Sequence, residues 1–163
     1  MALGEPIQEL ILREIKSRLE GINATSAPDT YYNRVRRVVR GLINPDQDVG
    51  ALTLQLSSVN NVVKQYQSGG GAGGVCYRVM TVAVDAWLHK EFLSDTDSIR
   101  LAADIERAVM SDRKNGGHSE CTWWQGAAPM AAPDEAAPTA YLRVQFTVDY
   151  RTAAGLPATP VGG

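Results

Sequence analysis

Four side chains in this sequence belong to the types that bind soft metal ions: Cys76, His89, His118 and Cys121. His118 and Cys121 are close in sequence, a pairing that half of a zinc site can use. Cys76 and His89 lie far from that pair and are not close to each other. The pattern therefore favours reduced, partly buried thiols and a surface histidine, and we predict neither a metal nor a cofactor.

Three glycines, Gly69, Gly71 and Gly74, match the G-x-G-x-x-G spacing of dinucleotide-binding loops. Such loops hold a pyrophosphate at the N-terminus of the helix that follows them. In this chain the residues that follow, 75–89, alternate as a strand, and no Gly-Lys-Ser or Gly-Lys-Thr sequence comes next. Segment 68–74 is therefore predicted to be a flexible loop that leads into a strand.

No combination of residues predicts a catalytic centre. A nucleophile must lie beside an oriented base, and neither histidine has the sequence context of a serine elbow or a cysteine protease. Asp95, Asp97 and Asp104 resemble a set of paired carboxylates. Asp97, or Thr96 beside it, instead suits the N-cap of a helix that begins near Ser98, and Asp104 suits an exposed position on that helix. We therefore predict that the protein is not an enzyme.

A row of arginines follows segment 31–40, which alternates as a strand. Its members are Arg34, Arg36, Arg37 and Arg40. The row has two interpretations. It is either a solvated strand face, or a subunit surface that pairs with carboxylates such as Asp104, Glu106 or Asp149 of a neighbour.

Trp123 and Trp124 are adjacent in another predicted strand, 120–125. Adjacent strand residues point to opposite faces, so one indole is expected in the core and the other outside, as an anchor for a partner. Replacing Trp124 by Ala, or Arg34 by Glu, is expected to weaken assembly more than folding. The full set of candidate interface residues is Arg34, Arg36, Arg37, Arg40, Asp104, Glu106, Trp123, Trp124, Asp149 and Arg151.

The overall composition is that of one soluble domain. With 163 residues the chain is long enough for one sizeable core. Its 16 basic and 18 acidic residues leave a net charge of -2, so no global field selects nucleic acid or an anionic membrane. We see no basic segment followed by an apolar run at the N-terminus and no stretch apolar enough to span a membrane. We therefore expect a protein made in the cytosol, with no membrane partner.

The elements that must position these residues follow from apolar periodicity. Helical spacing predicts helices over 7–22 and 98–110, and alternation predicts strands over 31–40, 51–56, 75–89, 120–125 and 141–150. Segment 59–66 is open between a strand and a short helix, and we prefer the strand. Strand 75–89 is apolar on both faces, which is typical of a central strand covered on two sides.

The order of these elements predicts an α+β fold. We expect a mixed, mainly antiparallel sheet of about five strands with the two helices packed on one face. Segment 126–139, rich in Ala and Pro, is predicted to be an extended loop or the tip of a hairpin. Residues 1–152 form the single domain of this prediction, and 153–163 form a flexible tail.

Two patterns in the second half of the chain belong together. The first is Ile99-Arg100-Leu101-Ala102-Ala103-Asp104-Ile105-Glu106-Arg107-Ala108, followed by Asp112 and Gly116-Gly117. The second is Val148-Asp149-Tyr150-Arg151-Thr152. In combination they resemble the tail terminator, or tail completion, proteins of long-tailed bacteriophages. The likeness covers roughly the second half of the chain, and the first half only in the order of its elements.

This resemblance implies a homohexameric ring on the last ring of tail-tube subunits. Such a ring stops tube polymerisation and presents a surface to head-completion or neck proteins. The implied location is the virion, after assembly in the host cytoplasm, with genomic DNA passing through the lumen without specific binding. One alternative is a neighbouring neck or connector-adaptor subunit, or a minor tail protein, of the same virion. A small cytosolic enzyme or ligand-binding domain is the alternative from another class.

Overall fold

The computed structural model describes residues 4–23, 30–41, 52–67, 74–88, 94–130 and 140–156. Two helices and five strands occur within these ranges, in the predicted order. Their bounds are α1 Ile7–Glu20, β1 Arg37–Arg40, β2 Thr53–Gln67, β3 Val75–Leu88, α2 Asp95–Met110, β4 Cys121–Met130 and β5 Ala140–Ala153. The protein is therefore of the α+β class, as predicted.

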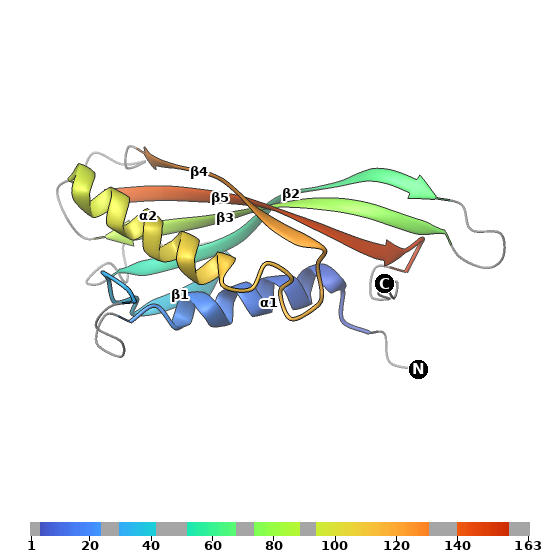
Figure 1. Ribbon diagram of the computed structural model, residues 1–163, viewed down its shortest axis with the longest axis horizontal. Helices are drawn as coiled ribbons and strands as arrows, with labels where there is room; N and C mark the ends of the chain where they lie inside the picture. The colour runs from blue at the N-terminus through green and yellow to red at the C-terminus, as the bar shows by residue number, and fades with distance from the viewer. Residues whose placement is uncertain are drawn as a thin grey trace.

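The strands form one twisted sheet in the order β1-β2-β3-β5-β4 (Figure 1). β1 runs parallel to β2, from Arg37 opposite Thr53 to Arg40 opposite Leu56. The other neighbouring strands are antiparallel, and the central pair β3 and β5 remains in register along its whole length. The predicted mixed, mainly antiparallel sheet is confirmed.

Both helices pack on the same face of the sheet, α1 over β1 and β2 and α2 over β4 and β5 (Figure 1). The apolar stripe of each helix is buried because its residues recur at helical spacing and so face the sheet together. From β5, alternate residues enter the same core, as the sequence predicts. They are Leu142, Val144, Phe146, Val148 and Tyr150.

The predicted strand 31–40 is wrong in its first part. Only Arg37–Arg40 joins the sheet, and Tyr32 and Asn33 lie in a bend. The reason is a carboxylate on α2. Asp104 accepts hydrogen bonds from the backbone N–H groups of Tyr32 and Asn33, at 3.0 and 2.8 Å, and holds this segment against the helix.

Strand β2 is longer than the predicted strand 51–56 and includes the segment 59–66 that the sequence left open. Bulges at Val59 and Lys64 each insert one extra residue into its pairing with β3. Each bulge shifts the alternation of faces by one position, so a continuous strand shows no continuous period. The preference for a strand over 59–66 is confirmed.

Two further element ends differ from prediction. Helix α2 begins at Asp95 rather than near Ser98, because the hydroxyl of Ser94 accepts the N–H of Asp97 at 3.1 Å and is the N-cap. Strand β4 continues past Gln125 to Met130 across a bulge, so the first part of the predicted loop 126–139 is a strand.

Several predicted features fall outside the described residues: the glycine-rich segment 68–73, His89, segment 131–139 and segment 157–163. Residues 153–156, which directly precede segment 157–163, are described by the structure. β5 ends at Ala153, and the N–H of Ala154 donates to the carbonyl of Gly74 at 2.7 Å. Strand β5 therefore extends by one residue into the segment predicted as the tail, and the prediction for the rest of that segment stays a prediction.

Candidate assembly surface

The sheet face opposite the helices carries no second layer among the described elements (Figure 1). β3 is the central strand of the five, as predicted for 75–89, but the expected cover on its second face is not found among the described elements. On this helix-free face β5 contributes a polar row, from Arg143 to Arg151, whereas the outward-facing residues of β3 are mostly apolar and include Val79 and Ala83. Asp85 is still 4% exposed because Arg143, directly opposite on β5, donates two hydrogen bonds of 2.7 and 2.8 Å to its carboxylate.

Trp123 lies on the helix-free face, on edge strand β4, and is 47% exposed. Its indole N–H donates to the carboxylate of Asp149 at 2.9 Å. The guanidinium of Arg113 lies 4.7 Å from the centre of its ring. The indole is thus oriented by two neighbours and remains open to a partner, which are the properties of an aromatic interface anchor.

Trp124 points the other way, toward the helices. It is partly buried and packs edge-on against Phe146, with the ring centres 5.5 Å apart. The expectation of one inward and one outward tryptophan is confirmed, and the structure assigns the outward position to Trp123. Replacing Trp124 should therefore act on folding first, contrary to the expectation stated above.

A second group on the helix-free face surrounds Arg151. This side chain forms an ion pair of 3.1 Å with Glu120 and lies 5.0 Å from the ring centre of Tyr77. Together with Asp149, these residues border an open depression of about 370 Å³. Because both signs of charge line it, the depression does not select a small anion or cation and is better suited to a mixed polar protein surface.

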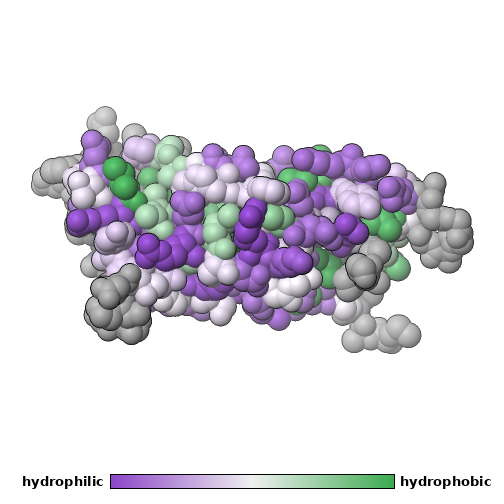
Figure 2. Space-filling view, viewed as in Figure 1, coloured by the Kyte–Doolittle hydropathy of each residue, from purple (hydrophilic) through white to green (hydrophobic). Residues whose placement is uncertain are grey.

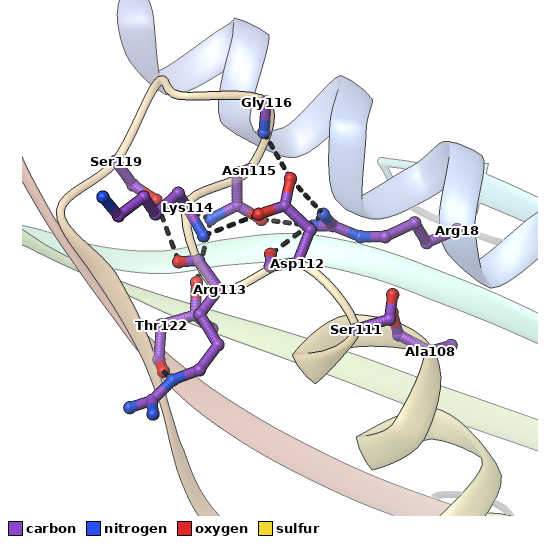
Figure 3. A network of polar contacts seen from close by, with 10 residues as sticks. All are labelled: Arg18, Ala108, Ser111, Asp112, Arg113, Lys114, Asn115, Gly116, Ser119 and Thr122. Carbon is purple, nitrogen blue, oxygen red and sulfur yellow. Dashed lines mark hydrogen bonds and ion pairs between the residues drawn. The ribbon is translucent and has the colours of Figure 1, made fainter.

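The connection between α2 and β4 determines where β4, the strand that carries Trp123, begins (Figure 3). Asp112 accepts the N–H groups of Gly116 and Lys114 at 2.6 and 2.9 Å, and Gly116 and Gly117 have positive φ. Residues 112–117 therefore form a tight turn. The Gly116 hydrogen bond, aided by that of Lys114 and the charge of Arg18, lowers the pKa of Asp112 from its usual 3.8 despite partial desolvation.

Asn115 fastens this turn to β4 and α1. It is fully buried, and its amide donates to the hydroxyls of Ser119 and Thr122, both at 2.8 Å. Arg18 of α1 donates to the Asn115 side-chain oxygen and, at 3.0 Å, to the carbonyl of Asp112 (Figure 3). The start of β4 is therefore held by both helices, and a rigid base supports the exposed indole of Trp123.

The arginine row lies at the opposite edge of the sheet from Trp123. Arg34, Arg36 and Arg37 are exposed, and Arg37 begins β1. Arg40 forms an ion pair with Glu9 of its own α1, with one N–O distance of 3.0 Å. The hydrogen bond from Arg40 lowers the pKa of Glu9 from its usual 4.5. Arg40 is therefore already engaged within the subunit.

Asp104 is not available to a neighbouring subunit. It is fully buried beneath Tyr32 and Asn33, which contradicts both its predicted exposure and its place in the candidate interface. Glu106, on the same helix, is half-buried, and so are Asp149 and Arg151 on the helix-free face. Of the predicted interface residues, the fold brings together Trp123, Asp149 and Arg151.

Sequence reasoning missed a second surface, the open edge of β2. β1 ends opposite Leu56, and no other described strand pairs with residues 57–67 on that side. Four large apolar side chains are exposed there: Val59 (54%), Val62 (47%), Val63 (46%) and Tyr66 (60%). The β2 and β3 strands project past the helices at this end, where hydrophobic patches reach the surface (Figures 1 and 2). The consecutive Val62 and Val63 were the available signal, since such a pair puts an apolar side chain on each face.

Within the described residues, no group of three or more His, Cys, Asp or Glu side chains could hold a metal ion, and Cys76 and Cys121 are free thiols. The same residues include no helix with the length and apolar character needed to cross a membrane. No protein-family model matches the chain, and no curated protein matches it.

Proposed function

We propose that this protein is a structural subunit of a bacteriophage tail, and that copies of it form a ring that caps the tail tube and joins it to the neck. The proposal starts from the resemblance of two segments to tail terminator proteins. These segments are adjacent in space, because α2 packs on β5. The turn at Gly116 and Gly117 then leads directly into β4 and Trp123.

The observation that carries the proposal is the presence of two different exposed apolar surfaces on one subunit. One is centred on Trp123, near the β4 edge, and the other is the open edge of β2. A subunit with one self-complementary patch forms a closed dimer, whereas two different patches that fit each other produce a head-to-tail contact. When the rotation between subunits closes, that contact produces a ring. The proposed role depends on shape and requires no active site.

The first test is the mass and symmetry of the purified protein. Native mass spectrometry and averaged electron micrographs should show a hexameric ring at low micromolar concentration. Added to polymerising tail-tube subunits of the same phage, the protein should bind tube ends and stop their growth. A ring of another symmetry that leaves tube growth unchanged would place the protein elsewhere in the neck, and a protein that remains monomeric would overturn the proposal.

A pair of variants tests the role of the exposed indole. Trp123→Ala should raise the dissociation constant of the ring by about tenfold or more, since aromatic anchors account for much of the free energy of an interface. The matched control is Ile99→Ala, which removes an apolar side chain that is 69% exposed on α2 and should leave the ring intact. Equal ring stability in both variants would show that Trp123 is not an anchor.

A further inference from the structure

Two open stretches at the sheet edges, strand β4 and residues 57–67 of β2, carry less charge than the inner strands, whereas the remaining open edge, β1, carries Arg37 and Arg40. The inner strands β3 and β5 contain Arg78, Asp85, Arg143, Asp149 and Arg151. By contrast, β4 contains no charged residue between Cys121 and Met130, and the open part of β2, 57–67, contains only Lys64. Exposed edge strands usually carry charges that prevent them from pairing with other chains. Pro129 and a bulge at Gln125 protect the second half of β4, and two bulges interrupt β2, but residues 121–124 and 60–63 contain no charge, proline or bulge. These two segments are therefore suited to being covered in the working state of the protein.

The structure also leaves room beside the open edge of β2. A depression of about 500 Å³ begins where β1 stops, between the first turn of α1 and the strand. Its lining includes Pro6 and Glu9 on the helix side and Gly41, Ser57 and Ser58 on the strand side. Another strand can therefore lie alongside β2, in line with β1.

We propose that β4 of a second copy of this chain occupies the open edge of β2, so that the sheets of neighbouring subunits join. Among the described strands, β4 forms the other outer edge of the sheet. Its ten residues are close in number to the residues 57–67 that lack a neighbour. The bulges at Val59 and Lys64 twist this edge, so pairing is expected mainly over the residues between them.

The apolar side chains of the two edges match face by face. Val62 lies opposite Val79 and so stands on the helix-free face, the face of Trp123. Val63 and Tyr66 stand on the helix side, as Trp124 does. A sheet that continues from one subunit to the next would thus place Val62 on the same face as the neighbour's Trp123 and reduce the exposure of both.

This inference rests on the ring proposed above and specifies its contact. Because β2 and β4 are different strands, their pairing is head-to-tail and can continue around a ring. Pairing of β2 with β2 would be symmetric and would stop at a dimer. These two arrangements give different products when they are cross-linked.

Cysteine cross-linking provides the test, because Cys121 is a natural thiol at the start of β4. In a Cys76→Ala background, single cysteines are introduced at each position from 57 to 67, and the assembled protein is oxidised. Residues directly opposite on antiparallel strands have Cα atoms about 4.5–5.5 Å apart, within the range that a disulfide spans. We expect one or two positions to give a ladder of dimers, trimers and larger products that disappears when Cys121 is replaced by Ser. Ile99→Cys is the control and should give no ladder.

Each other outcome has one meaning. Dimers that persist without Cys121 and never extend to trimers would show β2 paired with β2 and overturn the inference. A ring of the expected mass with no cross-link at any position would also overturn it, while leaving the proposed function intact. A monomer by mass, with no ladder, would overturn both.

A charge placed on the edge gives an independent readout. Val62→Lys should raise the dissociation constant of the ring by at least about tenfold, because an inserted charge is a usual means of blocking edge pairing. The matched control, Ile99→Lys, makes the same kind of change on α2 and should keep the wild-type ring. Circular dichroism verifies that both variants are folded. Equal ring stability in the two variants would overturn the pairing of this edge.

Discussion

The most direct consequence of the fold concerns Asp104, which the sequence presents as a surface charge and the structure buries completely. We expect Asp104→Ala to destabilise the subunit itself, because the carboxylate holds the segment before β1 against α2. It receives three donors from that segment: the N–H groups of Tyr32 and Asn33 and the side-chain amide of Asn33.

The size of the effect follows from these contacts. A hydrogen bond to a charged group contributes about 1.5–3 kcal/mol when its partner is buried, and about half of that when the donor regains water after the change. Tyr32 is 59% exposed, so its segment can be rehydrated, and the lower figure applies to each of the three donors. Removing a buried charge offsets part of the loss. The free energy of unfolding should therefore fall by about 2–4 kcal/mol.

Urea unfolding at a fixed protein concentration measures this loss as a lower midpoint with an unchanged slope. Asp104→Asn keeps the shape and one acceptor oxygen, and should lose roughly half as much. Glu106→Ala, on the same helix, is the control and should change stability by less than about 0.5 kcal/mol. If Asp104→Ala stayed within that same margin, or altered only the mass of the assembly, the carboxylate would not hold the 31–33 segment and the reasoning would be refuted.

Two more predictions concern the α2–β4 region. Trp124→Ala removes the edge-on contact with Phe146 and should lower the free energy of unfolding by about 2–3 kcal/mol in urea titrations. The same substitution at Trp123 should lower it by about 1 kcal/mol or less. Equal losses in the two variants would contradict the assignment of Trp124 to the core face and Trp123 to the helix-free face. Because the pKa of Asp112 is lower in the folded state than its usual 3.8, its stabilising effect is complete above that pH and is lost as the pH falls through the folded-state pKa. Asp112→Asn should therefore flatten the loss of stability below about pH 4, and an acid unfolding curve with the wild-type slope would contradict this.

Most elements of this fold can be predicted from local patterns. Leu142 to Tyr150 alternate in the sequence and alternate in the core, and the helical stripe around Ile105 is buried as its spacing predicts. These patterns depend on neighbours within one or two turns or along one strand, so the chain carries them without reference to its tertiary structure. The order of the elements and the helix placement on one face then follow from the need to cover apolar stripes.

Where the pattern is interrupted, local reasoning is less accurate. The bulges at Val59 and Lys64 shift the alternation in the middle of β2, and the N-cap of α2 is Ser94 although two aspartates follow it closely. In both cases the residue types are compatible with more than one local structure. The pairing with β3 fixes the positions of the bulges, and the hydrogen bond from the N–H of Asp97 to the hydroxyl of Ser94 fixes the start of the helix.

The candidate assembly surface depends on tertiary structure more than the secondary-structure elements do, so less of it could be predicted from the sequence. The sequence showed that one of Trp123 and Trp124 would face outward, but the register with β5 decided that it is Trp123. It could not show that Asp104 is buried, because its partners lie some seventy residues away in the chain. Nor could it show that β2 has an open edge, since an edge is defined by which strands lie beside it. Side-chain period is a property of a segment, whereas burial of a charge and exposure of an edge are properties of the assembled sheet.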